Sequence, residues 1–341
     1  MSEPRSSADE LRLDLARRLL EAGDDCLSGE RLAGDLGISR AAVSKHLSVL
    51  RQRGFSLDAS PRRGYRLVAW PDAVTPEAVL PRLGTRVLGQ TLVHRDVCVS
   101  TNTLAFAEGV AGAPHGLTVV ADAQTGGRGR RGRDWHSPPG AGLYVSVLLR
   151  PRLLPQAAPP LAFAAAVAVA EVLEKTLDLA PRLKWPNDVQ LGGRKVCGIL
   201  LEMSAEPERV AFVVCGIGLN VNADALPPDL AHRATSLRLE LGEPVARPLV
   251  LAPLLGALER WVDRYVDEGF APLREAWLAR AAHLGQEVRV DTPNGTILGV
   301  AETLDADGAL VLRLASGRPK RILVGDVWPA IDPVDGTAAT R

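Results

Sequence analysis

The chain predicts an α+β protein made of three consecutive parts. Its first 68 residues combine helical periodicity with turn signals and end in a hairpin pattern, whereas apolar strands and helices alternate from about 86 to 282. Short strands separated by turn dipeptides follow from 283 to 334. A length of 341 residues also exceeds what one hydrophobic core usually supports, so several domains are expected.

The overall composition is that of a soluble globular protein, with 46% hydrophobic and 23% charged residues. No uninterrupted apolar run in the sequence approaches the roughly 18–20 residues that span a membrane. The first residues are polar and include no apolar signal region, so a cytoplasmic protein with no membrane partner is expected. The four cysteines form no CxxC pair, which favours reduced thiols over disulfides or a zinc site; they are Cys26, Cys98, Cys197 and Cys215.

The first part has the element order of a winged helix-turn-helix. Residues 8–22 place leucines on one helical face, and Ser28 is positioned to cap a second helix over 30–36. Ser39 is positioned to cap a third helix over 40–53. Two short strands around a Pro/Arg/Gly turn then complete the pattern.

The net charge of zero hides a basic surface in this first part. Residues 1–37 hold five basic and nine acidic side chains, a sum of −4, whereas residues 38–66 hold seven basic and one acidic, a sum of +6. The positive charge therefore lies on the third helix and the wing, which such a fold presents to DNA. A solvated helix face on an interaction or dimerisation module is the alternative. The side chains expected to face DNA are Ser39, Arg40, Ser44, Lys45, Arg62 and Arg63.

A Pro- and Gly-rich stretch over 69–85 predicts a linker to the middle region. That region contains a strongly apolar helix over 160–177, which we expect to be packed on more than one side. Strands are expected at 116–122, 142–150, 195–203 and 209–221, and further helices at 248–266 and 270–282. The last part predicts a small β-barrel and a frayed tail over 335–341, with hairpin turns at Asn294-Gly295, Asp307-Gly308 and Ser316-Gly317.

The segment from Gln124 to Trp135, QTGGRGRRGRDW, predicts an anion-binding loop. It holds four arginines and four glycines in twelve residues. Glycines allow backbone amides to approach a ligand closely, and guanidinium groups match the oxygens of phosphates and carboxylates. We expect such a loop to be mobile until an anion orders it. Taken alone, the run is also compatible with a disordered basic loop that binds RNA or nothing.

Two of the five lysines in the chain stand in polar motifs. Lys184 opens the motif KWPND, which ends at Asp188, and Lys195 begins a buried strand beside glycines. In a chain that otherwise uses arginine, a lysine there indicates a compact ammonium at a phosphate site. Each residue taken singly is compatible with an ordinary surface side chain, but together with the arginine loop they predict one anion site. A polar cluster at Ser100-Thr101-Asn102 and the motif GIGLNVN at 216–222 complete the set.

At these residues the sequence resembles the bifunctional biotin–protein ligases that also act as the biotin-operon repressor. The matched stretches are SGERLAGDLGISRAAVSKHL, STN, GGRGRRGRDW, KWPND, RKVCGILLE and GIGLNVN, which occur in the family's order and span all three parts. Lipoate ligases share the catalytic fold but not this loop. The resemblance implies a winged helix-turn-helix over 1–68, a catalytic domain of the biotin/lipoate ligase type over 86–282, and an SH3-like barrel over 283–334.

The resemblance implies two half-reactions. Biotin and Mg-ATP first give biotinyl-5′-AMP and pyrophosphate, and the amine of one lysine on a biotin carboxyl carrier protein then attacks this adenylate, which releases AMP. In the family the adenylate also promotes homodimer formation, and the dimer binds operator DNA through its paired winged helices. Biotinyl-5′-AMP would therefore be both the intermediate of the enzyme and the corepressor of biotin synthesis genes.

Family analogy also assigns roles to individual residues. Arg128, Arg130 and Lys195 are suited to bring the biotin carboxylate and the α-phosphate together. Asp188 is assigned to Mg²⁺ or to positioning of the phosphates, because Mg²⁺ prefers hard oxygen ligands. The biotin ring is assigned to Ser100, Thr101, Asn102 and Gln124, with Gly198 in the pocket wall. The other ligand-binding positions are Gly127, Gly129, Arg133 and Lys184, together with Trp135 for adenine stacking and Asn220 on the nucleotide side.

Two other functions stay open at this point. The N-terminal module could have lost operator binding and serve dimerisation, or the chain could be a biotin-sensing transcription factor with an inactive ligase domain. The intact loop with Lys195 and Asp188 argues against the inactive enzyme, and the local charge of +6 argues against the loss of DNA binding. His136 and Cys197 depart from the family pattern near the pocket, and Cys197 is interpreted as a small packed residue rather than a reactive thiol.

Overall fold

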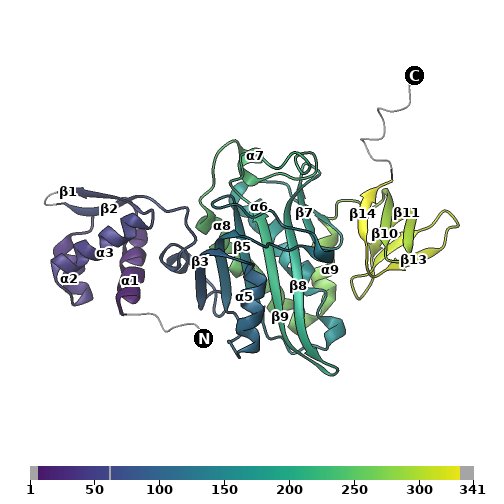
Figure 1. Ribbon diagram of the computed structural model, residues 1–341, viewed down its shortest axis with the longest axis horizontal. Coiled ribbons are helices and arrows are strands. Elements are labelled where there is room, and N and C mark those ends of the chain that lie inside the picture. Colours follow the sequence, from purple (N-terminus) through teal and green to yellow (C-terminus); the bar gives the residue numbers. More distant parts are fainter. Residues whose placement is uncertain (1–6, 61–62, 331–341) are drawn as a thin grey trace, which may run out of the picture.

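The computed structural model describes residues 7–60 and 63–330. Its three parts follow one another along the long axis of the molecule, with the winged helix-turn-helix at one end and the small β-domain at the other (Figure 1). The α+β class that the sequence predicts is confirmed. The predicted DNA contact Arg62 and the predicted tail over 335–341 lie outside the described residues.

The N-terminal domain contains the predicted helices and hairpin, and its helix caps are the predicted serines. The Ser28 hydroxyl accepts hydrogen bonds from the N–H groups of Glu30 and Arg31 at 3.2 and 3.4 Å, and the Ser39 hydroxyl accepts one from Ala42 at 3.1 Å. The elements are α1 Ser7–Ala22, α2 Gly29–Leu36, α3 Arg40–Gln52, β1 Ser56–Ser60 and β2 Gly64–Ala69. Their buried core includes Leu15, Leu19, Leu32, Val43, Leu47 and Leu50.

The segment between the first two domains is folded and largely buried. Ala78 packs into the core of the winged domain, whereas its neighbour Val79 packs into the core of the central domain. The side chain of Glu77 is 2% exposed and pairs with Arg12 of α1 and with Arg53 after α3. A carboxylate buried this deeply needs such partners, which fasten the segment to the winged domain. Because Ala78 and Val79 pack into different cores, the segment holds the two domains together. Its elements are α4 Pro76–Val79 and the 3-10 turn η1 Leu80–Arg82.

The central domain is built on one seven-stranded sheet with the order β3-β4-β5-β9-β8-β7-β6. The pair β3 and β4 is parallel, and the other neighbours are antiparallel. The strands are β3 Leu92–Cys98, β4 Thr118–Gln124, β5 Gly142–Leu149, β6 Arg182–Lys184, β7 Asp188–Leu191, β8 Arg194–Glu206 and β9 Arg209–Asn220. The helices are α5 Thr101–Val110, α6 Leu161–Leu177, α7 Leu237–Leu241, α8 Arg247–Glu268 and α9 Phe270–Leu278, with 3-10 turns η2 Arg130–Gly132 and η3 Pro155–Ala157. The predicted strands and helices of this region are present, and β3, β6 and β7 add to them.

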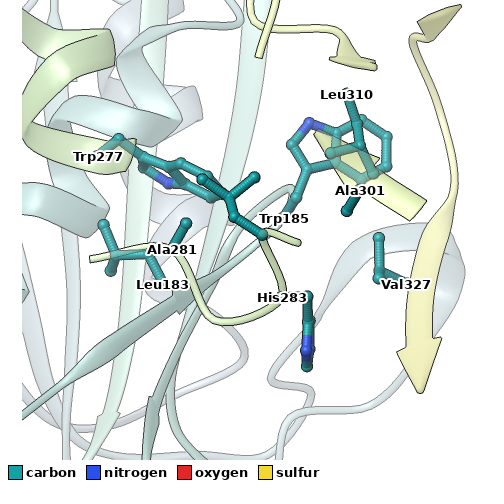
Figure 2. Close-up of a pocket in the computed structure, with 9 residues that line it drawn as sticks. Leu183, Trp185, Trp277, Ala281, His283, Ala301, Leu310 and Val327 are labelled. Carbon is teal, nitrogen blue, oxygen red and sulfur yellow. The ribbon is translucent and has the colours of Figure 1, made fainter. Parts of the chain in front are cut away.

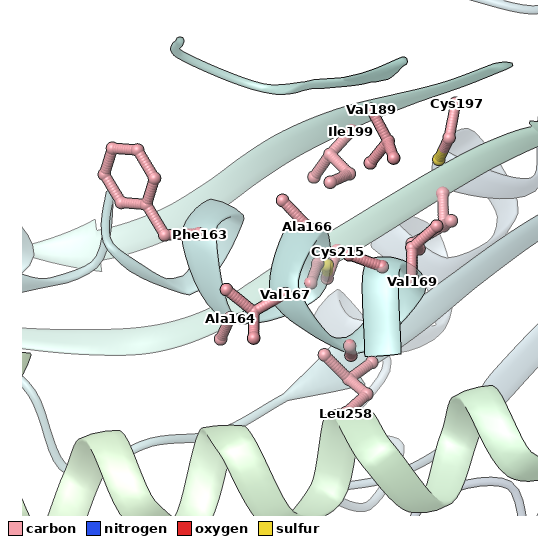
Figure 3. Close-up of a cluster of buried hydrophobic side chains, with 14 of the residues drawn as sticks. Phe163, Ala164, Ala166, Val167, Val169, Val189, Cys197, Ile199, Cys215 and Leu258 are labelled. Carbon is pink, nitrogen blue, oxygen red and sulfur yellow. The ribbon is translucent and has the colours of Figure 1, made fainter. Parts of the chain in front are cut away.

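Alternate residues along the central strands face opposite sides of this sheet. Val147 and Val213 belong to the large core under α6, whereas their neighbours Leu148 and Val214 pack with residues of α5. The side under α6 is therefore the hydrophobic one, and α8 covers it further. Figure 3 draws part of this core: Phe163, Ala164, Ala166, Val167 and Val169 of α6, Leu258 of α8, and Val189, Cys197, Ile199 and Cys215 of the sheet.

Helix α6 is the strongly apolar helix that the sequence predicts. The stretch Pro155–Leu177 is long and apolar enough to cross a membrane by length and composition, but 78% of its most apolar 18-residue window is buried inside the protein. A helix that is apolar on all sides is stable in a globular protein when a sheet and other helices shield its apolar surface from water. We therefore interpret α6 as the core helix of the central domain, packed on more than one side as expected.

The C-terminal domain is a five-stranded antiparallel sheet with the order β13-β12-β11-β10-β14. The predicted turn glycines Gly295, Gly308 and Gly317 adopt φ angles of 115°, 87° and 77°, which residues with a side chain rarely adopt. A last strand that was not predicted, β14, pairs with β10 and lies at the edge of the sheet. The strands are β10 Glu287–Thr292, β11 Gly295–Leu304, β12 Leu310–Arg313, β13 Pro319–Ile322 and β14 Asp326–Pro329.

The C-terminal domain packs closely against the central domain. Figure 2 shows the junction, where Leu183, Trp185 and Trp277 of the central domain and Val327 of β14 line one small cavity. The cavity left between them has a volume of about 10 Å³, which is about the least that holds one water molecule. The Trp185 indole N–H also donates a hydrogen bond to the carbonyl of Gly308 at 3.1 Å. This packing keeps β14 in a defined position beside the central sheet.

Candidate active site

One face of β8 and β9 is lined by glycines, because small residues alternate with core residues along both strands. Cys197 and Cys215 are fully buried on the core side, whereas Gly198 and Gly218 pair with each other on the opposite side. Burial raises the pKa of the Cys197 thiol, so it stays protonated and packs as a small apolar residue. The interpretation of Cys197 as a packed residue agrees with this position. The glycines therefore let a ligand or an aromatic ring come close to the backbone of these strands.

The polar cluster at the start of α5 meets the end of β4 on the same side of the sheet. Ser100, Thr101 and Asn102 are buried in the first turn of α5, with exposed fractions of 3–4%. The Gln124 amide oxygen accepts hydrogen bonds from the Thr101 N–H at 2.9 Å and from its hydroxyl at 3.2 Å. The Gln124 amide nitrogen donates to the Ser137 hydroxyl at 2.9 Å. The structure thus brings together the residues that family analogy assigns to the biotin ring.

Asn102 is held by two side chains that the sequence analysis did not single out. The Ser146 hydroxyl of β5 donates a hydrogen bond to its amide oxygen at 2.6 Å. Its amide nitrogen donates to the Glu202 carboxylate of β8 at 2.8 Å. Gly216 lies so close to Asn102 that a Cβ at this position would collide with the amide. Glu202 ends the matched stretch RKVCGILLE, and its even spacing from Gly198 along one strand is the signal that could have placed it on the glycine face.

The arginine–glycine loop is closed by hydrogen bonds within itself. The Gly129 N–H donates to the carbonyl of Arg133 at 2.7 Å, and the Trp135 N–H donates to the carbonyl of Gly127 at 2.9 Å. A Cβ at Gly127 would lie 2.5 Å from the Trp135 carbonyl oxygen and 2.6 Å from the Ser137 hydroxyl, so this close return of the chain requires glycine. The glycines of the motif therefore let the loop fold back on itself.

Trp135 lies on the glycine face of the central sheet. A Cβ added at Gly198 would come within 3.0 Å of its ring, and one at Gly218 within 2.5 Å. The Lys195 ammonium lies 5.2 Å from the centre of the Trp135 ring, within the range of a cation–π contact. The indole nitrogen of Trp135 is buried and has no hydrogen-bond partner within the described part of the chain. The ring thus lies between the lysine strand and the arginine loop.

Arg128 and Arg130 point from the loop toward the sheet. The Arg128 guanidinium lies 3.1 Å from one oxygen of Glu202 and donates to the Thr103 hydroxyl at 3.2 Å. Arg130 instead donates to the neutral amide oxygen of Asn187 at 3.1 Å, and we find no ion pair for it among residues 7–60 and 63–330. Burial lowers the pKa of Arg130, although nearby aspartates act in the opposite direction. Arg130 therefore remains available to an anionic ligand.

The other two arginines of the loop turn to the C-terminal domain. Arg133 and Arg131 both pair with the Asp326 carboxylate at the start of β14. The distance from the Arg131 guanidinium is 3.3 Å. Arg131 also adopts a left-handed backbone conformation with φ 59°, which is uncommon for a residue with a side chain. Arg133 was predicted to bind the ligand, and the structure directs it to Asp326 instead of the cluster around Lys195. Asp326 is 13% exposed and was not found by sequence reasoning, since it lies in the unpredicted β14.

The two lysines of the motif region lie near one carboxylate. The Lys195 ammonium is 2.7 Å from an oxygen of Asp188, its near neighbour across β7 and β8. Lys184 lies 4.2 Å from the centre of the Trp328 ring of β14. Burial lowers the pKa of Lys184, and the nearby Asp188 acts in the opposite direction. Lys195, Asp188 and Trp135 therefore form one cluster, with Lys184 at its side toward the C-terminal domain.

The remaining predicted ligand position lies at the end of β9. The Asn220 amide nitrogen donates to the carbonyl of Thr235 at 2.9 Å, and the Lys195 N–H donates to the carbonyl of Arg233 at 2.8 Å. Both bonds fasten the segment before α7 to the edge of the cluster. Within the described ranges, no group of three or more His, Cys, Asp or Glu side chains could hold a metal by itself. Any Mg²⁺ at Asp188 would therefore complete its coordination with water or with substrate oxygens.

The predicted DNA-facing residues of α3 are on the surface of the winged domain. Ser39, Arg40, Ser44 and Lys45 are exposed, and so is Arg63 of the wing. Not all of the positive charge counted over 38–66 is free, because some basic side chains pair within the protein. The charge of Arg53 is offset by Glu77 and that of Arg66 by Asp58 at 2.9 Å, whereas Arg51 donates to the neutral carbonyl of Leu57 at 3.2 Å and keeps its charge. The free basic surface is therefore narrower than the sequence sum suggests and is centred on the start of α3.

The fold and the site together define a class of protein. A cluster of buried amide and hydroxyl groups lies beside cations that can hold carboxylate and phosphate groups, and a winged helix-turn-helix is attached. This arrangement is that of a carboxylate-activating ligase joined to a winged helix-turn-helix. Three family models match in the same order: "HTH domain" over residues 12–66, "Biotin/lipoate A/B protein ligase family" over 95–220, and "Biotin protein ligase C terminal domain" over 283–328.

Curated relatives match almost the whole chain. The bifunctional ligase/repressor BirA of Bacillus subtilis is 40% identical over 319 residues, which cover 93% of this chain and 98% of the relative. BirA of Escherichia coli is 32% identical over 297 residues, 86% of this chain and 90% of the relative. A solved structure of a biotin protein ligase from Aquifex aeolicus in complex with biotin and ATP has a TM-score of 0.62 and 30% identity, and covers 70% of this chain and 98% of its own.

The chain therefore belongs to the family of bifunctional biotin–protein ligases and repressors. The predicted family, fold and enzyme class are confirmed. The alternative of a transcription factor with an inactive ligase domain loses support, because the loop, Lys195 and Asp188 lie together in one cluster.

Proposed function

We propose that this protein activates biotin with ATP to biotinyl-5′-AMP and transfers the biotin to one lysine of a biotin carboxyl carrier protein. The proposal rests on one observation: a cluster of uncharged hydrogen-bonding groups lies close to a cluster of cations. Buried hydrogen-bonding groups of Thr101, Asn102 and Gln124 lie on one side, and the cations Arg128, Arg130 and Lys195 lie on the other. Biotin has a neutral ureido ring at one end and a carboxylate at the other, which fits this division.

The ring end of biotin suits the polar cluster between α5, β4 and β5. The ureido group offers one carbonyl acceptor and two N–H donors, and the hydroxyls and amides of Thr101, Ser146 and Gln124 supply both kinds of partner. Ser100 lies beside them, and Gly198 lies on β8, which β9 separates from β5 in the sheet. Groups of fixed orientation select such a ligand, because an analogue without the ureido group forms no hydrogen bonds with them.

The first half-reaction needs two anions to approach each other. A biotin carboxylate oxygen attacks the α-phosphorus of ATP, a new oxygen–phosphorus bond forms, and the bond to the β-phosphate breaks to release pyrophosphate. Arg128 and Arg130 are placed to hold these anions, and Lys195 to stabilise the charge that develops on the α-phosphate. Lys195 would exchange its pair with Asp188 for the phosphate in this role.

Mg²⁺ would be held by Asp188 together with phosphate oxygens of ATP. The ion pair with Lys195 uses one oxygen of the Asp188 carboxylate, so the other oxygen suits a hard cation. Magnesium sites that bind nucleotide phosphates commonly use only one or two carboxylates of the protein as ligands. When bound, the ion would offset the charge of the phosphates and orient pyrophosphate as the leaving group.

The second half-reaction requires that the adenylate survive until the carrier arrives. The neutral amine of the carrier lysine attacks the acyl carbon, the amide bond forms, the bond to the phosphate oxygen breaks, and the amine proton passes to solvent as AMP leaves. Because water destroys this mixed anhydride, a cover over the site is needed. The loop from Gln124 to Trp135, with Gly127 and Gly129 in its turns and Trp135 on the sheet, is suited to be that cover.

Transfer of biotin to the carrier is the direct test of the enzyme. The protein is incubated with radiolabelled biotin, Mg-ATP and an apo carrier domain, and the carrier lysine is analysed by mass spectrometry. We expect biotin on one lysine and release of AMP and pyrophosphate. Omission of ATP, or a carrier with that lysine replaced by arginine, is the control. If no biotin reaches the carrier, the proposed transfer is wrong.

For repression, we propose that biotinyl-5′-AMP promotes a homodimer that binds operator DNA of biotin synthesis genes. Arg40 and Lys45 lie exposed on α3, where they can contact phosphates or base edges. The strand β3 lies at an edge of the central sheet, with Val97 57% exposed and Val99 64% exposed just after it. Such an edge is suited to pairing with a second chain, and a two-fold dimer matches a palindromic site.

Free thiols at all four cysteines agree with a cytoplasmic protein.

A further inference from the structure

Glu202 touches two predicted parts of the ligand site at the same time. One of its oxygens accepts a hydrogen bond from the Asn102 amide nitrogen at 2.8 Å. Both of its oxygens face the Arg128 guanidinium, at 3.1 and 3.2 Å. The Glu202 side chain is 28% exposed and that of Arg128 is 48% exposed, so the pair stands at the mouth of the site rather than in the core.

A carboxylate is an unexpected neighbour for a site that must bind anions. Arg128 is suited to hold the substrate carboxylate, yet in this structure a protein carboxylate already holds it. A second carboxylate that approached Arg128 would be repelled by Glu202 unless the first pair opened. The hydrogen bond to Asn102 does not need the negative charge, since a neutral amide oxygen accepts it as well. The effect of the negative charge of Glu202 can therefore be tested separately from the effect of its hydrogen bond to Asn102.

We propose that Glu202 is a positioning residue and an internal counter-ion of the ligase site. It fixes the amide of Asn102 so that the amide oxygen faces Ser146, and it neutralises Arg128 until the carboxylate of biotin replaces it. The inference rests on the proposed function, because it takes biotin as the ligand of Arg128 and Asn102. Its consequence is a site that binds biotin less tightly than its cations would allow and keeps Arg128 from stray anions.

Two substitutions separate the two roles. Glu202→Gln keeps an acceptor for Asn102 and removes the charge, so biotin no longer has to displace a carboxylate from Arg128. We expect its dissociation constant for biotin to fall about two- to fivefold, the range of a partly exposed ion pair. Glu202→Ala also removes the acceptor and lets the Asn102 amide turn, so we expect weaker binding by about three- to tenfold. The measurement is calorimetric titration with biotin alone, without ATP.

Binding of a neutral ligand by the same variants provides a second measurement. Biotinamide has the same ring but no carboxylate, so it has nothing to exchange with Glu202. We expect Glu202→Gln to bind biotinamide as the wild type does, and Glu202→Ala to bind it more weakly. A role of Glu202 in folding alone would weaken both ligands in both variants, because a distorted pocket does not distinguish a carboxylate from an amide.

Glu206→Gln is the matched control, because Glu206 lies on the same strand and pairs with Arg209 at 2.9 Å at the far end of β8. It should change neither dissociation constant, and thermal unfolding should show that all variants are folded. Weaker binding of biotin by Glu202→Gln, or an equal gain for biotinamide, would overturn the role of Glu202 and leave the proposed function intact. A wild-type protein that binds no biotin would overturn both.

Discussion

The Lys195 ammonium lies 2.7 Å from the Asp188 carboxylate, which joins two neighbouring strands of the sheet at the centre of the candidate site. The same pattern recurs beside it, where Glu202 holds Arg128 and Asp326 holds Arg131 and Arg133. A site for two anionic substrates therefore carries its own carboxylates. Binding of substrates is an exchange of partners at these cations, and each exchange can be tested separately.

Lys195→Ala is expected to slow adenylate formation by about 10²–10³-fold, because the variant has no ammonium directed at the developing charge. Biotin-dependent release of pyrophosphate from Mg-ATP measures this step. Lys175→Ala is the matched control, since Lys175 pairs with Glu171 on the exposed side of α6. The control should release pyrophosphate at the wild-type rate. Near-normal release by Lys195→Ala would exclude Lys195 from this role.

Asp326→Asn is expected to loosen the cover over the adenylate, because Arg131 and Arg133 lose their anchor on β14. These arginine side chains are 37% and 59% exposed, so we expect at most about a fivefold faster escape of adenylate. The ratio of pyrophosphate released to biotin transferred measures this escape at limiting carrier. Asp305→Asn, which breaks a pair with Arg321 elsewhere in the same domain, should leave the ratio unchanged. An unchanged ratio in Asp326→Asn would show that this anchor does not retain the adenylate.

Local chemistry made much of the fold predictable from the sequence. Ser28 and Ser39 cap their helices because a hydroxyl there satisfies free N–H groups, and this depends on a few neighbouring residues only. The hairpin glycines adopt positive φ for an equally local reason. The arginine loop and the lysine strand were predicted to form one site, and Trp135 and Lys195 lie together as that prediction requires.

The carboxylates of the site could not be predicted in the same way. Glu202 reaches Asn102 across 100 residues of sequence, and Asp326 reaches Arg133 across 193. Glu77 is an ordinary charged residue of a linker by sequence, yet it is buried and paired with two arginines of the winged domain. Their partners depend on how strands and domains pack, and no spacing along the chain encodes such pairings. The short strands β6, β7 and β14 show too little periodicity to be predicted, whereas the equally short β12 and β13 are marked by the turn dipeptides beside them.

The four cysteines are expected to differ in reactivity. Burial raises the pKa of Cys215 to about 12 and raises that of Cys197 as well, whereas Cys26 is exposed. Because the thiolate is the reactive form, iodoacetamide at about pH 8.5 should label Cys26 and spare Cys197 and Cys215 until urea is added. A raised pKa in the folded state also means that the unfolded state releases protons first. The free energy of unfolding should therefore fall as the pH rises above about 8.5. Mass spectrometry locates the label, and labelling of Cys197 at the rate of Cys26 would contradict its packed position.

Operator binding is expected to depend on biotinyl-5′-AMP and on the exposed start of α3. A mobility-shift titration with DNA from upstream of biotin synthesis genes, with and without the adenylate, measures both. Lys45→Ala should weaken binding and reduce the slope of log affinity against log salt by about 0.9 for each DNA phosphate that Lys45 neutralises in the wild type. Arg17→Ala is the matched control, because Arg17 is exposed on α1 and lies 3.5 Å from Asp14. The control should bind as the wild type does. If the adenylate causes no shift even at low salt, the protein is a ligase whose N-terminal domain no longer represses transcription.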